Sequence, residues 1–208
     1  MAHDTQGPSP DRASTWASTM AGHVLPHSPA TVRFAHATST ASTGSQSVVT
    51  REQREENEAQ LFSPLATLSF GAGVRAIPES PDLFRTCFER DRDRILHANA
   101  FRRLAGKTQV FVFPDDHQRT RLTHALEVAQ VATAIARALG LNVALTEAIA
   151  IGHDCGHGPG GHASEDALSP YIVGGYDHAQ WGADVTLNSL NLCRETLDGI
   201  RNHSWSRP

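Results

Sequence analysis

Hydrophobic residues recur at helical spacing in the middle of the chain. Between Thr120 and Gly140, apolar side chains lie three, four or seven positions apart, at Leu122, Leu126, Ala129, Ala136 and Leu139. This spacing predicts an amphipathic helix, and glycine at position 140 is typical of a C-terminal cap. A second helix is predicted from about Val143 to His153. Its apolar residues are Leu145, Ile149 and Ala150. The short connection at residues 140–142 favours antiparallel packing of the two helices.

Two further helices are predicted on either side of this pair. Residues 80–82, Ser-Pro-Asp, are typical of a helix start, because proline suits the first turn and an acid favours the positive end of the helix dipole. This helix should run to about Leu104 and end at Gly106. Its apolar residues are Phe84, Phe88, Ile95 and Leu96. Another helix should start at residues 176–178, with Asp177 as its N-cap. Its apolar residues are Trp181, Val185 and Leu192. The pattern predicts an all-α fold.

The first 60 residues lack any such period. Up to Thr50, the segment consists mostly of Ser, Thr, Ala, Pro, Gly and His, and its formal charges are Asp4, Asp11, Arg12 and Arg33. A segment of this composition cannot bury enough apolar surface to offset its chain entropy, so residues 1–60 are predicted to be a disordered tail. The polar run 51–60 at its end is compatible with a solvated helix. The ordered domain should occupy residues 63–208.

Composition narrows the class of protein. The 208 residues carry a net charge of -4, which argues against a chain that is basic throughout and binds nucleic acid. The three cysteines, Cys87, Cys155 and Cys193, are far apart and form no C-x-x-C motif, so a reducing compartment is expected. No apolar run approaches the ~20 residues that span a bilayer, and the N-terminus lacks the apolar core of a secretory signal. We therefore expect no membrane span and a cytoplasmic location.

One segment is basic within this acidic chain. Residues 85–107 contain seven basic and three acidic side chains, a balance of 7 − 3 = +4. The basic residues are Arg85, Arg90, Arg92, Arg94, Arg102, Arg103 and Lys107; the acidic ones are Glu89, Asp91 and Asp93. Two interpretations are open. The charges can pair with each other on a solvated helix face, or the arginines can contact a polyanion such as nucleotide phosphates or a nucleic-acid backbone.

Histidines and carboxylates gather between residues 121 and 165. His153 and Asp154 fall at the end of the second predicted helix, and His124 lies near the start of the first, so antiparallel packing would bring the three together. Imidazole and carboxylate are ligands of divalent metals, whereas single histidines in loops are more often simple polar groups. After the glycine-rich loop 156–161, His162 and Glu165 lie three apart on one helix face, a pairing that suits acid/base chemistry.

Six segments of the chain follow one another in a specific order. They are residues 88–95 (FERDRDRI), 100–104 (AFRRL), 107–111 (KTQVF), 121–124 (RLTH), 153–157 (HDCGH) and 161–165 (GHASE). Together they resemble the dGTP triphosphohydrolase-like branch of the HD-domain superfamily, over about Ser63 to Pro208. The resemblance implies an all-α HD-domain helical bundle. It also implies hydrolysis of dGTP or another deoxynucleoside triphosphate to deoxynucleoside and inorganic triphosphate.

The resemblance also implies roles for individual residues. The implied metal ligands are His124, His153 and Asp154, for Mn, Mg, Fe or Zn. The implied catalytic residues are His162, Glu165 and His178, and the implied substrate contacts are Arg121 and His157 at phosphate and Gln109 near base and sugar. The implied reaction is attack of water at the α-phosphorus, with His162, supported by Glu165, transferring protons. Oligomers are common in this family, which leaves a homo-oligomer open.

The chain departs from the family pattern at three points. Gly160 stands where an aromatic residue is usual, and Cys155 where an aliphatic one is usual. The fourth metal ligand of the superfamily is an Asp on a later helix, and no Asp in the C-terminal part of this chain has a comparable context. We therefore expect an HD domain that is incomplete at its C-terminus and binds metal more weakly. The remaining alternatives are a non-catalytic nucleotide or single-stranded nucleic-acid binding module, an inactive fragment, and a different HD phosphohydrolase.

Overall fold

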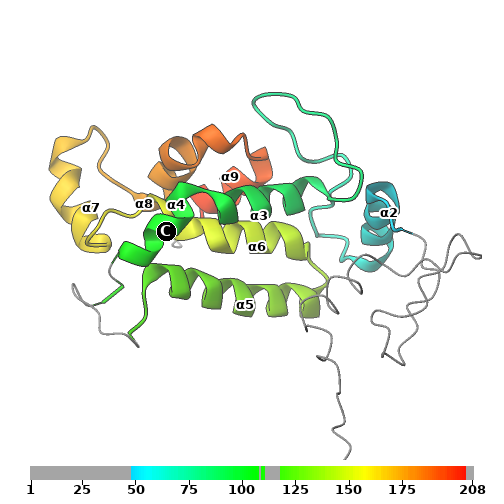
Figure 1. The fold of residues 1–208 in the computed structure, drawn as a ribbon, viewed down its shortest axis with the longest axis horizontal. Helices are drawn as coiled ribbons and strands as arrows, with labels where there is room; N and C mark the ends of the chain where they lie inside the picture. Colours follow the sequence, from blue (N-terminus) through cyan, green and yellow to red (C-terminus); the bar gives the residue numbers. More distant parts are fainter. Residues whose placement is uncertain (1–47, 108, 111–117, 205–208) are drawn as a thin grey trace, which may run out of the picture. The chain divides into compact units, whose positions relative to one another are not determined.

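The computed structural model describes residues 48–107, 109–110 and 118–204, and those from residue 49 onward form a bundle of helices (Figure 1). In chain order the elements are α2 (Arg51–Leu61), α3 (Cys87–His97), α4 (Asn99–Arg102), η1 (Arg103–Gly106), α5 (Arg121–Leu139), α6 (Val143–Gly152), η2 (His153–Gly156), α7 (His162–Leu168), η3 (Ser169–Tyr171), α8 (His178–Trp181), η4 (Gly182–Thr186), η5 (Asn188–Leu190) and α9 (Arg194–Arg201). These ranges include no β-strand; Arg75 and Cys193 form an isolated bridge. The predicted all-α fold is confirmed.

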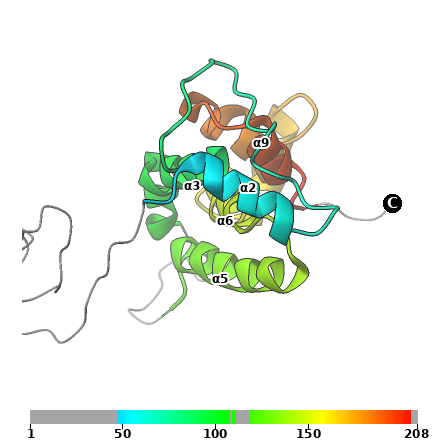
Figure 2. The ribbon, with the colours of Figure 1, turned by 90° about the vertical axis from the view of Figure 1, so that its right-hand side faces the viewer.

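Helix α6 lies at the centre of the bundle. It packs against α3, α5 and α9, and Figures 1 and 2 show α3 and α5 on opposite sides of it. The turn between α5 and α6 explains this packing. Gly140 has φ +66° and caps α5, and the Asn142 side chain accepts a hydrogen bond from the Leu145 N–H to cap α6. The three-residue connection forces the two helices to run antiparallel, as the sequence predicts (Figure 1).

The buried stripe of α5 differs from the predicted one. It consists of Arg121, Ala125, Ala129, Thr133 and Ala136. Two leucines assigned to the core are exposed instead: Leu126 retains 45% and Leu139 59% of its accessible surface. The physical reason is close packing, because small alanines allow α5 to approach α6 and leave the larger side chains at the flank of the contact.

Helix α3 begins later than the sequence analysis predicted. Thr86 and Glu89 form a capping box, in which each side chain accepts a hydrogen bond from the other residue's backbone N–H. Asp82 belongs to a turn before the helix and accepts hydrogen bonds from the N–H groups of Phe84 and Arg85. The single helix expected up to Leu104 is also interrupted. Extended backbone at residue 98 separates α3 from α4.

The region after residue 176 also differs in part. Asp177 caps α8 by accepting hydrogen bonds from the N–H groups of Ala179 and Gln180, as predicted. The helix then widens into the π-helical segment η4 rather than continuing regularly. Val185 is therefore exposed, whereas Leu192 lies beyond the helix and is buried in the core.

Helix α2 lies within the stretch assigned to the tail. Its Thr50 cap forms a capping box with Gln53, and Glu55 is buried beside Arg51 at 2.6 Å. Arg54 forms an ion pair with Glu89 at the start of α3. These contacts order residues 51–60, so the boundary of the tail does not lie at residue 60. The predicted disorder of residues 1–47 concerns residues outside those that the structure describes.

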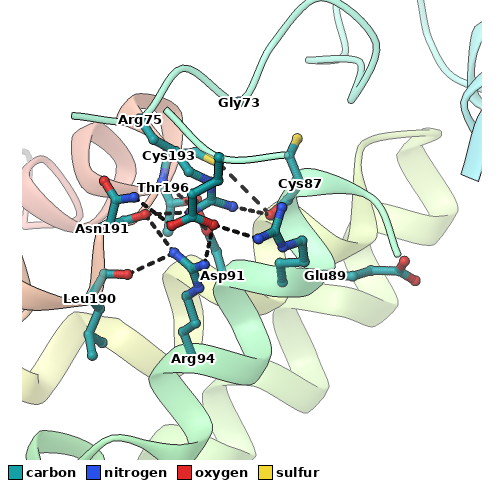
Figure 3. A network of polar contacts seen from close by, with 12 residues as sticks. Gly73, Arg75, Cys87, Glu89, Asp91, Arg94, Leu190, Asn191, Cys193 and Thr196 are labelled. Carbon is teal, nitrogen blue, oxygen red and sulfur yellow. Dashed lines mark hydrogen bonds and ion pairs between the residues drawn. The ribbon is translucent and has the colours of Figure 1, made fainter. Parts of the chain in front are cut away.

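A buried polar cluster around Asp91 connects α3 to the start of α9 (Figure 3). The Asp91 carboxylate is fully buried, and its Oδ1 lies 2.6 Å from Arg75 Nη1. Its Oδ2 accepts hydrogen bonds of 2.7 Å from the backbone N–H of Cys193 and from the hydroxyl of Thr196. Arg75 also donates to the carbonyl oxygens of Asn191 and Cys87. The position of α9 is thus set by a charge buried on α3.

Most of the basic segment 85–107 is paired within the molecule. Arg85 pairs with Asp82 and Asp93, and Arg92 pairs with Asp93 and Glu147. Arg90 and Arg94 both reach Glu79. Because these arginines already have carboxylate partners, the geometry favours the self-paired interpretation of the segment over a surface for a polyanion.

Candidate metal and catalytic site

Three side chains predicted as metal ligands meet at one end of the α5–α6 pair. His124 lies in the first turn of α5, and His153 and Asp154 lie in η2, directly after α6. One ligand atom from each lies within 4.8 Å of the other two, and the rings of His124 and His153 are 5.6 Å apart. The antiparallel packing of α5 and α6, predicted from their short connection, therefore brings His124, His153 and Asp154 together.

The hydrogen bonds of His153 show why this group suits a cation. Its Nδ1 lies 2.7 Å from the carbonyl oxygen of Ala150. A carbonyl only accepts, so Nδ1 carries the proton and Nε2 presents a lone pair. That Nε2 lies 3.1 Å from Asp154 Oδ1, which is also an acceptor. Two facing acceptors are compatible only when a positive charge lies beside both, and a nitrogen and a carboxylate oxygen are a fitting donor pair for a divalent metal.

Asp154 is ionised and held in place from two sides. Arg121, itself buried, lies with Nη1 2.9 Å from Oδ2, and His157 Nε2 lies 3.3 Å from Oδ1. Burial alone would raise the pKa of Asp154. The hydrogen bond from His157 and the charge of Arg121 outweigh burial and keep this pKa below its ordinary value.

The glycine loop makes room for Arg121. Gly161 has φ +63°, and a Cβ at this position would lie 2.0 Å from Nη2 of Arg121. Only glycine adopts this backbone conformation without strain and leaves space for the guanidinium. The loop is also fixed at its other end, where the Tyr176 hydroxyl donates to the carbonyl oxygen of Gly156 at 2.5 Å.

Glu165 joins the predicted catalytic residues. Its Oε2 lies 3.1 Å from Nδ1 of His162, and its Oε1 accepts from both the backbone N–H and Nδ1 of His178. The side chain of His162 is 73% exposed, so its Nε2 faces solvent while Nδ1 is held. Burial would raise the pKa of Glu165, but the hydrogen bonds from His162 and His178 lower it. The arrangement is that of an oriented imidazole available to a solvent-side substrate.

His178 lies deeper than His162. Its ring stacks on that of His157, with centroids 3.6 Å apart. Burial and the neighbouring His157 lower the pKa of His178 to about 4, although Glu165 acts in the opposite direction. His178 is thus neutral at pH 7. The four side chains His157, His162, Glu165 and His178 form a second group whose ligand-type atoms lie within 4.8 Å of one another.

Two remaining predicted residues lie outside the group around Glu165. Arg121, predicted to contact a phosphate, has its guanidinium buried against Asp154. Gln109 was expected near base and sugar; its Oε1 is buried without a hydrogen-bond partner among the described residues, and their contacts do not join it to the cluster. Cys155 is packed in the core, and burial raises the pKa of its thiol to about 12, which agrees with a packing role rather than a soft ligand.

The sequence analysis missed two residues beside the cluster. Lys107, counted there only as part of the basic segment, donates from Nζ to the carbonyl oxygen of His157, and burial together with Arg103 lowers its pKa. His203 follows α9, and its Nε2 lies 3.0 Å from Nε2 of His178. The available signal for His203 was weak: a histidine just after the strongly amphipathic stretch 194–201.

The chain is similar to known proteins over most of its length. A family model of the HD domain matches residues 121–208. The chain is 53% identical over 161 residues to a deoxyguanosinetriphosphate triphosphohydrolase-like protein of Caldanaerobacter subterraneus, covering 74% of this chain and 48% of that protein. Proteins with the same description from Desulfatibacillum aliphaticivorans and a Ruegeria species are 48% and 52% identical, over 74% and 69% of this chain and 46% and 41% of theirs. The chain spans less than half the length of each of these relatives.

Proposed function

Because this chain carries an HD domain and is homologous to deoxyguanosinetriphosphate triphosphohydrolase-like proteins, we propose that it takes part in metal-dependent hydrolysis of a deoxynucleoside triphosphate, dGTP or another, to deoxynucleoside and inorganic triphosphate. The observation that carries the proposal is the proximity of two groups. The metal-ligand set His124, His153 and Asp154 is connected through His157 to the hydrogen-bonded set around Glu165. A metal set next to an oriented acid/base pair is what hydrolysis of a phosphate ester requires.

The metal ligands in this proposal are His124, His153 and Asp154, and the ion is Mn, Mg, Fe or Zn. When bound, such an ion would withdraw charge from phosphate oxygens and lower the pKa of a water molecule. Arg121 holds the Asp154 carboxylate through Nη1, and its positive charge beside the metal ligands would attract the phosphates of a bound substrate. Lys107 adds a second cation, because its Nζ donates a hydrogen bond to the carbonyl oxygen of His157.

The proton transfers fall to the exposed histidine. His162 is held at Nδ1 by Glu165, so its Nε2 can give a proton to the 5′ oxygen of the leaving deoxynucleoside while water attacks the α-phosphorus. The Glu165 carboxylate would stabilise the charged imidazolium. His178, neutral and bonded to the same carboxylate, fixes the second oxygen of Glu165 and so its orientation. His157 lies beside His162 and His178 in the same group of side chains.

The test is release of inorganic triphosphate from dGTP in the presence of Mn²⁺ or Mg²⁺. The chain should release it, and a double variant His153→Ala, Asp154→Ala should not. His97→Ala is a matched control, because this histidine is exposed at the end of α3 and should leave the rate unchanged. Equal release by the chain and the double variant would refute the proposal.

A cytoplasmic location remains part of this proposal. Its support is that Cys87, Cys155 and Cys193 are all free thiols. Among the described residues, no helix has the length and apolar character needed to cross a membrane.

A further inference from the structure

Two of the three cysteines lie together, although 106 positions separate them in the sequence (Figure 3). Cys87 is the first residue of α3, and Cys193 is the N-cap of α9. The Cys193 thiol points to the carbonyl oxygen of Cys87 at 3.9 Å. A hydrogen bond with the Cys87 side chain is the largest cause that raises the pKa of Cys193, ahead of burial. The two thiols are therefore in contact.

The backbones of both cysteines are held by the buried Arg75–Asp91 ion pair. Arg75 Nη2 donates to the carbonyl oxygen of Cys87 at 3.0 Å, and Asp91 Oδ2 accepts from the N–H of Cys193 at 2.7 Å. The thiols are held more weakly, since their contacts to carbonyl oxygens are 3.7 Å for Cys87 and 3.9 Å for Cys193 and a thiol is a weak donor. The surroundings thus keep the sulfurs close and leave their side chains free to turn.

Gly73 leaves the space in which the two sulfurs can meet. A Cβ at this position would lie 2.9 Å from Sγ of Cys87 and 3.6 Å from Sγ of Cys193, so both sulfurs border the same small volume. A disulfide brings its sulfurs to about 2.05 Å, which needs such free space beside them. Gly71 has nearly the same backbone, φ +81° against +83° for Gly73, but nothing lies within 4 Å of its Cβ position. The contact with the thiols is therefore particular to Gly73.

The two thiols differ in their access to solvent. Cys87 is half-buried and lines, together with Gly73, a cavity of about 450 Å³. Cys193 is fully buried. Because oxidation follows access to the sulfur, a small oxidant in the cavity meets Cys87 first.

We infer that Cys87 and Cys193 form a reversible disulfide when hydrogen peroxide enters this cavity. The Cys87 sulfur bonds to one peroxide oxygen, the O–O bond breaks, and a sulfenic acid and one water form. The Cys193 sulfur then attacks the Cys87 sulfur, the S–O bond breaks, and the hydroxide leaves with the Cys193 thiol proton as a second water. Two thiols are oxidised by two electrons, and one peroxide is reduced to two waters. Cellular thiols reopen the bond by exchange.

The disulfide would tie the start of α3 covalently to the start of α9. The chain just beyond α9 supplies His203, which lies beside His178 in the candidate site. Oxidation would therefore fix the helix that presents His203. In a reducing compartment, disulfides of this kind are typically transient and sense the redox state. The inference does not rest on the proposed function, because bond formation needs neither metal nor nucleotide.

Thiol chemistry of the full chain tests the inference. The reduced chain, freed of reductant, is treated with hydrogen peroxide, and it should lose two of its three free thiols. Trypsin leaves Cys155 and Cys193 in one peptide, because residues 138–193 contain no Lys or Arg, so chymotrypsin is added to cleave after Trp181. Mass spectrometry should then find a peptide pair linked through Cys87 and Cys193, and dithiothreitol should separate it. Over-oxidised Cys87 with Cys193 still free would overturn the inference.

A pair of variants tests the order of events. Cys193→Ser suits its position, since serine is a favoured N-cap residue. Without its partner thiol, Cys87 should stay a sulfenic acid that dimedone labels, whereas the unaltered chain should resist labelling because the disulfide forms. Cys155→Ala is the control and should behave like the unaltered chain. Equal labelling of Cys87 with and without Cys193 would show that the second thiol takes no part.

Two glycine variants test the space beside the sulfurs. Gly73→Ala and Gly71→Ala strain the same loop to a similar degree, but only the first places a methyl group against the thiols. We expect Gly73→Ala to slow disulfide formation by about tenfold, since overpacking of this kind costs about 1–3 kcal/mol and 1.36 kcal/mol is tenfold in rate. Gly71→Ala should form the bond as fast as the unaltered chain. Equal rates in the two variants would contradict the role of this space.

Discussion

Asp91 and Asp154 are both buried and both paired with an arginine, yet their surroundings differ. Arg75 lies 2.6 Å from Asp91, and Arg121 lies 2.9 Å from Asp154. Around Asp91, the second carboxylate oxygen accepts from Cys193 and Thr196, and the arginine donates its remaining bonds to backbone carbonyl oxygens. Asp91 Oδ1 has no hydrogen bond, but its ion pair with Arg75 balances the buried charge, so protein atoms alone hold the Asp91 cluster.

The Asp154 cluster is incomplete. The lone pair of His153 faces the Asp154 carboxylate, and Nε2 of His178 lies 3.0 Å from Nε2 of His203. Arg121 Nε and His157 Nδ1 are buried without hydrogen-bond partners among the described residues. Buried polar groups are normally satisfied, so two unpaired ones on the residues that flank Asp154 fit a site that takes a ligand. We therefore interpret the Arg75–Asp91 pair as structural and the Arg121–Asp154 pair as part of a binding site.

The two clusters are connected through α9. Asp91 fixes the N-terminal end of this helix, and the chain just beyond its C-terminal end supplies His203. The structural cluster thus positions part of the functional one. Four experiments follow, from the largest expected effect to the smallest.

Removing the charge of Asp91 should affect stability most. Asp91→Asn leaves Arg75 as a buried unpaired charge, and we expect the free energy of unfolding to fall by about 3–5 kcal/mol. Urea denaturation of the metal-free chain measures it. Asp93→Asn is the control: its partners Arg85 and Arg92 are partly exposed, so its cost should stay below about 1 kcal/mol. Equal costs would mean that the two ion pairs do not differ in kind.

Metal should stabilise the Asp154 cluster. An ion at a free concentration 100-fold above its dissociation constant should raise the free energy of unfolding by about 2.7 kcal/mol. Asp93→Asn and His97→Gln should keep this gain. His153→Gln should lose most of it, because the glutamine cannot supply the imidazole ligand. Thermal unfolding with and without Mn²⁺ measures the difference, and a gain retained in full by His153→Gln would contradict the assignment of the site.

Gly161→Ala tests the space beside Arg121. The added methyl group meets the guanidinium and the backbone is strained at φ +63°, so we expect a loss of about 1–3 kcal/mol together with weaker metal binding. Gly160→Ala is the neighbouring control. Its φ is not positive, and its Cβ would meet Ser164 Oγ at 3.2 Å, a contact that a small side-chain shift relieves. If Gly160→Ala weakens metal binding as much, general loop disruption explains the result.

Glu79→Gln should have the smallest effect. The hydrogen bond from Arg94 is the main cause that lowers the pKa of Glu79 to about 2, from an ordinary value of 4.5. Its folded pKa is depressed, so the stabilisation is present above about pH 4.5 and is lost as pH falls toward 2. We expect a cost below about 1 kcal/mol at pH 7. Urea denaturation measures the difference in free energy of unfolding between the unaltered chain and Glu79→Gln. This difference should narrow below pH 4.5; a difference independent of pH would show that charge is not its cause.

Local pattern predicted the part of the site that lies on α5, α6 and the segment after them. Helical period placed His124 and His153, and a three-residue connection forced antiparallel packing, so proximity followed from sequence. The spacing of His162 and Glu165 gave their contact in the same way. The start of α3 is also encoded locally, since Thr86-x-x-Glu89 is a capping-box pattern, but Ser-Pro-Asp at 80–82 is an earlier helix-start pattern that forms a turn instead.

The sequence alone determined helices α5 and α6, the turn between them and a cluster of metal-type ligands, because these depend on contacts within one or two turns or across a short connection. Tertiary structure alone decided that Arg75 pairs with Asp91, that Arg121 faces Asp154, and that His203 reaches His178. These contacts join segments far apart in the chain, and no local period encodes which helix end meets which. They depend on how α9 and the glycine loop pack, which is a property of the whole bundle.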